Sequence, residues 1–249
     1  MTETPVPGPV PRFELSEWLR LGVVAGITWR GSDEPPFDLG LGGKRTPVGL
    51  VMDRWRALQE SYPGFEGMVI SRQVHGVEVR WQGPARGLVI QYGADGHATD
   101  TPGLLLGVTA ADCVPVYLAD PIGRRVALVH AGWRGVAGGI LPRGIDLMEA
   151  RGSVVENLLV HCGIGICGQC YEVGSEVFSR CGLSEPAGGG GLLDLRGVLV
   201  DQARRSGAIH ISTSELCSKC HQERFFSHRG SGGGDGRMAA YIGLVPRAV

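Results

Sequence analysis

A cysteine and a histidine lie at the open end of one predicted β-hairpin. Apolar, β-branched runs at residues 114–118 and 126–129 flank the sequence Asp-Pro-Ile-Gly at 120–123, in which Pro and Gly favour a type I turn. If the loop consists of those four residues, Cys113 lies directly opposite His130, with Cβ atoms about 5 Å apart on one face. A loop longer or shorter by one residue would place them on opposite faces. A thiol beside an imidazole can bind a metal ion or act as nucleophile and base.

Three segments of the chain supply candidate metal ligands. They are Gln-Val-His-Gly at 73–76, Asp-Cys at 112–113 and His-Ala-Gly-Trp-Arg-Gly at 130–135. Two histidines and one cysteine are sufficient for a zinc ion whose fourth coordination position stays open, which is typical of catalytic sites. Such an ion would lower the pKa of a bound water molecule and supply hydroxide near neutral pH. A His-Gly or Asp-Cys dipeptide alone is more often a packed or turn residue pair than a ligand, so the spacing by itself leaves both interpretations open.

The composition indicates a globular protein with no affinity for nucleic acid or membrane. The 249 residues include 43% hydrophobic side chains, and the net charge is −1 without a basic block, so the footprint of a nucleic-acid-binding protein is missing. No apolar run is long enough to span a bilayer. Glu3 and several prolines stand where a signal peptide would need an apolar core. We therefore expect a cytoplasmic protein, in which the 7 cysteines are thiols, ligands or catalysts rather than disulfides.

Strands and helices alternate along the chain, and short turns join several neighbouring strands. Besides the hairpin, we expect strands at 23–29, 68–70, 77–81, 104–108, 158–162, 209–212 and 238–244, a helix capped by Thr46, a helix at 171–180 and a helix capped by Asp194 at 195–206. This order favours an α/β fold with mixed sheets and covering helices. We expect a flexible, Pro-rich tail at 1–12 and a single catalytic domain at 13–249.

Several ordered motifs resemble one protein family. The candidate segments QVHG, ADCVPV and HAGWRG are followed by YEVG at 171–174, LDL at 193–195, Cys217, FFSHR at 225–229 and GR at 236–237. In this order they are similar to the multicopper polyphenol oxidoreductase (laccase-like) family, the YfiH-type proteins, also described as peptidoglycan-editing factors and purine nucleoside phosphorylases. The resemblance runs from about Gly67 to Leu244. It implies a four-layer α/β/β/α sandwich with mixed sheets.

The resemblance also implies a metal site and an activity. Its His, Cys and His ligands carry over onto His75, Cys113 and His130, with Zn²⁺ as the expected ion and Cu²⁺ as the alternative. Members are described as enzymes that phosphorolyse adenosine, inosine and methylthioadenosine and deaminate adenosine. We therefore expect a zinc-dependent purine nucleoside phosphorylase with adenosine deaminase activity, whose partners are small molecules. The sequence leaves open whether the protein is a monomer or a homodimer.

Two carboxylates are candidates for proton transfer. Deamination needs hydroxide at the purine C6 atom and a nearby acid or base. Asp95 matches an aspartate that the family usually carries, whereas Asp112 could instead orient His130 or a strand end.

Arginines are candidates for phosphate binding because a guanidinium group binds phosphate through two hydrogen bonds. We expect this role for Arg134, Arg229 and Arg237, with a surface salt bridge as the alternative, and a substrate-binding role for Gln73. His228 stands where the family often has Tyr, and it could be a base, a stacking surface or neither.

Four further cysteines form two C-x-x-C pairs, at 167–170 and 217–220. Such pairs are the form of a structural zinc knuckle, although the gap between them is longer than usual. Because Cys170 and Cys217 match positions where relatives often carry Cys, we expect free thiols, with a second zinc as the alternative.

Three other functions stay open at this stage. The same three ligands could hold copper in a polyphenol oxidase, although one copper cannot reduce dioxygen as multicopper centres do and no His-x-His pair is present. Cys113 and His130 could instead be nucleophile and base of a cysteine hydrolase that edits peptidoglycan precursors. A binding partner of the division or wall machinery with a purely structural metal is the non-enzymatic alternative.

Overall fold

Two mixed β-sheets dominate the computed structural model, which describes residues 2–42 and 45–246. The first sheet runs β1 (Thr4–Val6), β2 (Arg12–Glu14), β3 (Val23–Thr28), β15 (Met238–Leu244), β8 (Leu104–Ala110), β4 (Gly67–Arg72), β6 (Gly87–Tyr92). The second runs β14 (His210–Thr213), β11 (Leu159–Cys162), β9 (Val114–Asp120), β10 (Arg125–Ala131), β7 (Gly96–Thr99), β5 (Val79–Trp81). Both sheets contain parallel and antiparallel neighbours.

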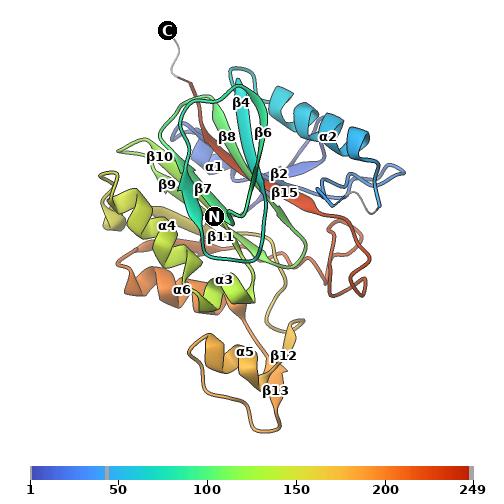
Figure 1. The fold of residues 1–249 in the computed structure, drawn as a ribbon, viewed down its shortest axis with the longest axis vertical. Coiled ribbons are helices and arrows are strands. Elements are labelled where there is room, and N and C mark those ends of the chain that lie inside the picture. The colour runs from blue at the N-terminus through green and yellow to red at the C-terminus, as the bar shows by residue number, and fades with distance from the viewer. Residues whose placement is uncertain (1, 43–44, 247–249) are drawn as a thin grey trace.

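The helices are α1 (Ser16–Leu19), α2 (Val48–Glu60), α3 (Trp133–Ala137), α4 (Ile140–Glu149), α5 (Ser175–Arg180) and α6 (Leu195–Arg205), with a 3₁₀ turn at Val155–Asn157. Helix α2 covers the outer face of the first sheet, and α3, α4 and α6 cover that of the second (Figure 1). Along the part of the chain that the structure describes, each helix is too short or too polar to cross a membrane.

Three buried clusters define the layers. Helix α2 packs Trp55 onto Met68 of the first sheet, the two sheets meet through side chains such as Leu106 and Leu128, and α4 packs Ile145 onto the outer face of the second sheet. Alternate residues of one strand enter different clusters, as the period of two along a strand requires. The expected four-layer α/β/β/α sandwich in a single domain is thus confirmed.

The predicted hairpin forms, but its register differs from the expected one. Asp120 pairs with Arg125, so the loop is 121–124 and His130 lies opposite Pro115. The side chain of Asp120 closes this turn by accepting the N–H of Gly123 at 2.7 Å. The shift amounts to two residues, and an even shift keeps side chains on their faces. Cys113 therefore lies diagonally beside His130, on the same face, rather than directly opposite.

The amino-terminal segment is not the flexible tail that the prolines indicated. Strand β1 pairs with β2, Val10 is buried, and Glu3 places Oε1 3.1 Å from Nε2 of the fully buried His161. Pro5 is tolerated in β1 because β1 is an edge strand, where a missing N–H costs little. The prolines at 7, 9 and 11 lie in the connection between β1 and β2. Residue 1 lies outside the described residues.

Two other expectations fail in detail. The helix α2 begins after Pro47 rather than after a Thr46 cap, because the hydroxyl of Thr46 donates to Asp38 Oδ2 at 2.8 Å instead. The stretch expected as a helix at 171–180 begins as strand β12 (Glu172–Gly174), which pairs with β13 (Gly190–Leu192) before α5 follows. These three elements form a small lobe that projects from the sandwich (Figure 1).

Candidate metal centre

Three strand ends bring His75, Cys113 and His130 together. His75 follows β4, Cys113 precedes β9, and His130 lies near the end of β10, so both sheets contribute. One ligand atom from each lies within 4.8 Å of the others. The imidazole rings of the two histidines meet edge to face with centroids 5.0 Å apart. His75 is exposed and His130 is buried, so the cluster opens on the side of His75.

The buried carboxylate of Asp95 holds the two histidines in position from the side of the protein interior. Its Oδ1 atom lies 3.0 Å from Nδ1 of His130 and accepts the backbone N–H of His75 at 2.9 Å. Its Oδ2 atom accepts the N–H groups of Val74 and Gly76 at 3.1 and 2.8 Å. These bonds hold His75 in the left-handed region at φ 59° and leave Nε2 of His130 for a metal ion. A carboxylate behind a ligand histidine is the usual second layer of a metal site.

The pKa values of Cys113 and His130 favour a thiolate–imidazolium pair. Burial by itself raises the pKa of the Cys113 thiol, but the charge of His130 and hydrogen bonds from both histidines outweigh burial and lower the pKa to about 6. Burial lowers the pKa of His130, but the Cys113 charge and the Asp95 hydrogen bond outweigh it and raise the pKa to about 9. A thiolate is the form of cysteine that binds metals.

A missing side chain makes room for the ligands. A Cβ atom on Gly132 would lie 2.8 Å from Sγ of Cys113 and 3.4 Å from Cδ2 of His75. The donor set of two imidazoles and one thiolate, with Asp95 behind it, fits Zn²⁺ with one open position. It also fits copper, since imidazole and thiolate bind both metals.

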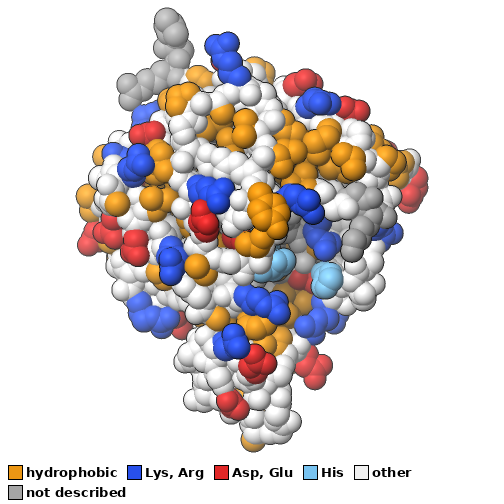
Figure 2. Space-filling model, viewed as in Figure 1, with side chains coloured by type: hydrophobic (Ala, Val, Ile, Leu, Met, Phe, Trp, Pro, Cys, Tyr) orange, Lys and Arg blue, Asp and Glu red, His pale blue; other side chains and the backbone are white. Residues whose placement is uncertain are grey.

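The cluster lies in the wall of a cavity of about 780 Å³. The lining includes five arginines: Arg45, Arg72, Arg134, Arg229 and Arg237. Figure 2 shows histidine side chains in the hollow with basic side chains around them. Among the described residues, Arg45 is the one of these five with a carboxylate partner, Asp235 at 4.0 Å. The cavity therefore combines a candidate metal site with four arginines that have no carboxylate partner among the described residues.

The two carboxylates expected to transfer protons both make several hydrogen bonds within the protein. Asp95 is fully buried, and the cavity lining does not include it. Asp112 lines the cavity, but its Oδ1 accepts the hydroxyls of Ser218 and Ser227 at 2.6 and 2.7 Å, and its Oδ2 accepts the N–H of Arg229 at 2.6 Å. Orienting His130 was the alternative role for Asp112, but Nδ1 of His130 bonds to Asp95. Asp112 positions the Phe-Phe-Ser-His-Arg segment of the cavity wall.

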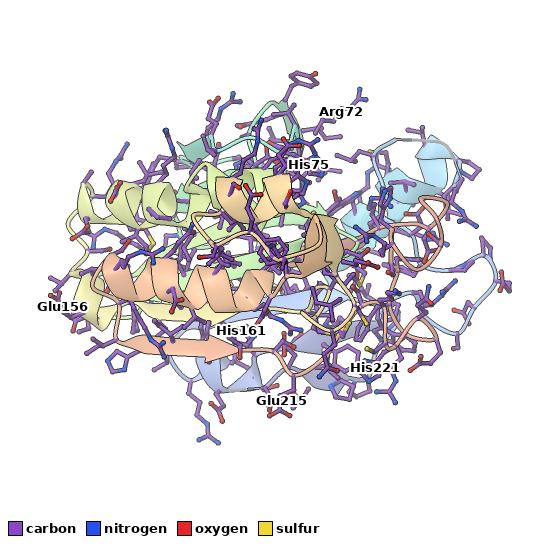
Figure 3. The ribbon with its side chains drawn as sticks, turned by 90° about the horizontal axis from the view of Figure 1, so that it is seen from below. Arg72, His75, Glu156, His161, Glu215 and His221 are labelled. Atoms are coloured by element: carbon purple, nitrogen blue, oxygen red, sulfur yellow. The ribbon has the colours of Figure 1, made fainter. Side chains whose placement is uncertain are left out.

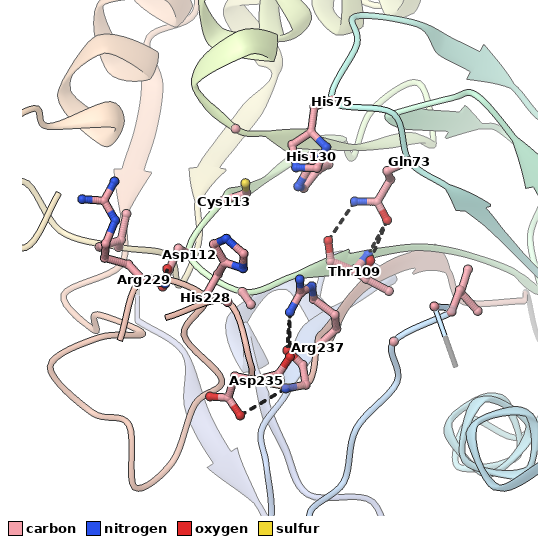
Figure 4. A pocket seen from close by; sticks show the side chains of 18 of the residues that line it. Gln73, His75, Thr109, Asp112, Cys113, His130, His228, Arg229, Asp235 and Arg237 are labelled. Atoms are coloured by element: carbon pink, nitrogen blue, oxygen red, sulfur yellow. Dashed lines mark hydrogen bonds between the residues drawn. The ribbon is translucent and has the colours of Figure 1, made fainter. Parts of the chain in front are cut away.

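Gln73 also supports the wall rather than presenting a free amide. Its Nε2 donates to the carbonyl of Thr109 at 2.8 Å, while its Oε1 accepts the N–H and the hydroxyl of the same residue at 2.9 and 2.8 Å (Figure 4). The side chain thus joins the loop of His75 to the end of β8.

The three expected phosphate ligands all reach the cavity. The Arg134 guanidinium stacks on Trp133 at 4.4 Å, and that of Arg229 lies 5.2 Å from the ring of Tyr171. Arg237 donates Nη1 to two backbone carbonyls, and Figure 4 shows it across the cavity from the two histidines. His228 is exposed and also lines the cavity.

Four of the cavity residues that were not predicted could contact a substrate: Arg45, Arg72, Trp133 and Tyr171. Trp133 and Tyr171 belong to the HAGWRG and YEVG motifs. These motifs indicated that the two segments matter, but not that their aromatic rings line the cavity. Arg72 directly precedes Gln73 at the end of β4, and only its place beside the candidate motif could have pointed to it. Arg45 carried no local signal.

Comparison with known proteins gives consistent matches. Residues 37–245 match the family described as multi-copper polyphenol oxidoreductase laccase. The chain is 35% identical to the purine nucleoside phosphorylase YlmD of Geobacillus stearothermophilus, over 92% of this chain and 95% of that protein. It is 37% identical to the adenosine deaminase RL5 from an unknown prokaryotic organism, over 58% of this chain and 60% of that protein. The crystal structure of YlmD from Geobacillus stearothermophilus has a TM-score of 0.87 at 30% identity, covering 98% of this chain and 100% of that one.

Proposed function

The chain belongs to the multi-copper polyphenol oxidoreductase laccase family, and we propose that it is a zinc-dependent purine nucleoside phosphorylase. Its substrates are adenosine, inosine and methylthioadenosine, and deamination of adenosine is a second reaction at the same site. Relatives named purine nucleoside phosphorylase and adenosine deaminase support both activities.

One observation carries the proposal. A single cavity joins the His75, Cys113 and His130 cluster to arginines that have no carboxylate partner among the described residues. Phosphorolysis needs a site for an anion and a site for a nucleoside side by side, and guanidinium groups are the side chains best suited to hold phosphate. The rings of Trp133 and Tyr171 give the same cavity flat apolar surfaces for a purine.

Each cavity residue has a separate role in the proposed reactions. In phosphorolysis, an oxygen of phosphate bonds to C1′ of the ribose while the bond from C1′ to the purine nitrogen breaks and the base takes up a proton. Arg134 and Arg229 hold the phosphate and offset its charge, and Trp133 stacks on the base. His228 moves the proton, since Asp95 and Asp112 are occupied by structural hydrogen bonds. A Zn²⁺ ion on His75, Cys113 and His130 would supply Lewis-acid chemistry for both reactions.

A copper-dependent polyphenol oxidase is less well supported. Within the described ranges, the one other group of potential ligands is a set of four cysteines without histidine. Multicopper chemistry would need additional histidine ligands close to the first site.

A cysteine hydrolase is the second candidate, and a specific observation favours it. The lowered pKa of Cys113 beside His130, which Asp95 orients, is the arrangement of an activated nucleophile with its base. Such an enzyme could edit peptidoglycan precursors without any metal.

One experiment separates these functions. The purified protein is analysed for metal, then incubated with adenosine with and without phosphate, and the products are identified by mass spectrometry. Adenine with ribose 1-phosphate, formed only when phosphate is present, and lost in Cys113→Ala but kept in Cys181→Ser, is the expected result. Absence of both adenine and inosine from reactions of the zinc-loaded protein would refute the nucleoside activity. Activity that survives a chelator but not Cys113→Ala would favour the cysteine hydrolase.

A further inference from the structure

The four cysteines outside the candidate active site converge on one point. The Sγ atoms of Cys167, Cys170, Cys217 and Cys220 all lie within 4.8 Å of one another. Those of Cys170 and Cys220 are 3.4 Å apart, and those of Cys167 and Cys220 are 4.0 Å apart. A tetrahedral zinc ion with Zn–S bonds of about 2.3 Å has S–S edges of about 3.8 Å. The spacing is therefore that of a tetrathiolate site.

The backbone holds this arrangement in place. Gly165 forms a parallel bridge to Cys217, and the N–H of Ser218 donates to the carbonyl of Gly165 at 3.0 Å. Sγ of Cys217 accepts two backbone N–H groups, from Cys167 at 3.3 Å and from Cys220 at 3.4 Å. Hydrogen bonds from peptide N–H groups favour the charged form of a sulfur ligand. The two C-x-x-C pairs are thus joined by the fold even though 46 residues separate them in sequence.

This cluster is distinct from the first one. The cavity lining contains none of the four cysteines. His221 hydrogen-bonds through Nδ1 to the carbonyl of Cys217 at 3.1 Å, and Figure 3 shows His221 well apart from His75. The two clusters therefore bind separate ions if both are occupied.

We propose that Cys167, Cys170, Cys217 and Cys220 bind one Zn²⁺ ion as a closed, structural site. Four protein thiolates complete a tetrahedron and leave no open position, which separates this site from a catalytic one. A disulfide would use only two of the four sulfurs and would need an S–S distance of about 2.05 Å. The sequence predicts free thiols, whereas the fold brings the two C-x-x-C pairs together across the long gap between them.

The ion would fix two loops of the cavity wall relative to each other. The first loop carries Ile166 and leads into Tyr171, and the second leads from Ser218 to the segment with His228 and Arg229. Asp112 hydrogen-bonds with Ser218 and with the N–H of Arg229, so the second loop is anchored at both the cysteine cluster and the cavity. The small lobe of β12, α5 and β13 begins at Glu172, two residues after Cys170.

Metal content of matched variants tests the site. Cells are grown with added zinc, and the intact protein is assayed for zinc by mass spectrometry. We expect Cys167→Ser with Cys220→Ser to lose one zinc per chain, while Cys181→Ser, which changes a cysteine outside both clusters, loses none. Cys113→Ala should keep this zinc. With Co²⁺ in place of zinc, the Cys113→Ala protein should show the intense charge-transfer and visible bands of a tetrathiolate centre, and the double variant should not.

A measurement on the unaltered protein covers the case in which the double variant fails to fold. Cys220 is exposed, so an alkylating reagent reaches it unless zinc holds the sulfur. We expect the four thiols to be protected in the zinc-loaded protein and alkylated after chelation, as read by peptide mass spectrometry. Alkylation of Cys220 at the same rate with and without zinc would overturn the proposal. So would a disulfide between Cys170 and Cys220 in the freshly purified, zinc-supplied protein.

Discussion

Gly132 has no space for a side chain because the ligand cluster fills it. We predict that Gly132→Ala lowers zinc affinity at the first site about 10- to 100-fold, the usual cost of disturbing the surroundings of a ligand. The reason is that the added Cβ would lie 2.8 Å from Sγ of Cys113. Competition with a chromophoric chelator measures the affinity. Gly83→Ala is the control, since no atom lies within 4 Å of a Cβ at that glycine. Equal affinities for the two variants would contradict the placement of the ligands.

Arg134 and Arg151 form a matched pair for the phosphate hypothesis. Each guanidinium stacks on a tryptophan, at 4.4 Å from Trp133 and 4.5 Å from Trp81, but only Arg134 lines the cavity. We predict that Arg134→Ala raises the KM for phosphate by about 10- to 100-fold, because a charge-assisted hydrogen bond contributes roughly 1.5–3 kcal/mol. Arg151→Ala should leave the KM unchanged. Steady-state phosphorolysis of adenosine at varied phosphate gives both values, and an unaltered KM for Arg134→Ala would remove it from the phosphate site.

Residue types pointed to the site more reliably than to the role of each residue. His75, Cys113 and His130 were predicted as a set, and the structure brings them together. Asp95 was expected to move protons, yet it is buried behind His130. No local pattern could reveal this role, because it depends on contacts with a loop about 20 residues away that only the fold creates.

The sequence predicted the start of a helix or strand correctly where a local hydrogen bond sets it and no distant partner changes it. Asp194 caps α6 by accepting the N–H of Arg196, as the sequence predicted. The helix expected at 171–180 begins instead as β12, because its partner β13 lies in a glycine-rich run that gives no strand signal. In the hairpin, side chains lie on the predicted faces of the sheet, but the register differs from the predicted one. The loop begins one residue later than predicted, at 121, and the Asp120 side chain accepts a hydrogen bond from the N–H of Gly123 within the turn.

Strand β1 is held by a buried carboxylate, and its contribution to stability is testable. Burial raises the pKa of Glu3, but the close contact with His161 outweighs burial and lowers the pKa below its ordinary value of 4.5. The Glu3 carboxylate therefore stabilises the fold fully above about pH 4.5, and this contribution is lost as the pH falls below that value. We predict that Glu3→Gln lowers the free energy of unfolding at pH 7 by about 1–3 kcal/mol.

Urea unfolding at pH 7 and at pH 3.5 measures this effect. The difference between wild type and Glu3→Gln should narrow at the lower pH. Glu17→Gln, which alters an exposed carboxylate on α1, should match wild type at both. A difference of the same size at both pH values would show that the charge of Glu3 does not stabilise β1.

The sandwich as a whole creates the cavity where strand ends of the two sheets meet. His75 follows a strand of the first sheet, whereas Cys113 and His130 flank strands of the second. The packing of one sheet on the other therefore sets the distances within the cluster. Much of that interface is apolar. Because the hydrophobic effect is non-directional, apolar packing sets the distance between the two sheets but not how one sheet is aligned along the other. Polar contacts between the sheets add the directional constraint.

His97 makes such a contact, and it makes the whole sandwich sensitive to acid. Fully buried on β7, it bonds through Nε2 to the hydroxyl of Ser71 on the other sheet at 3.0 Å and through Nδ1 to Gln82 at 3.0 Å. Burial, with the nearby charge of Arg80, lowers its pKa to about 4 from 6.5. The unfolded chain therefore binds a proton at His97 below about pH 6.5, whereas the folded protein binds it only below about pH 4. The linked loss of folding stability reaches roughly 3 kcal/mol across this window.

We predict that the unfolding free energy of wild type falls more steeply between pH 6.5 and pH 4 than that of His97→Gln, as measured by denaturant titration. His210→Gln, at an exposed histidine on β14, should keep the wild-type slope, and equal slopes for wild type and His97→Gln would mean that His97 does not stay neutral between the sheets.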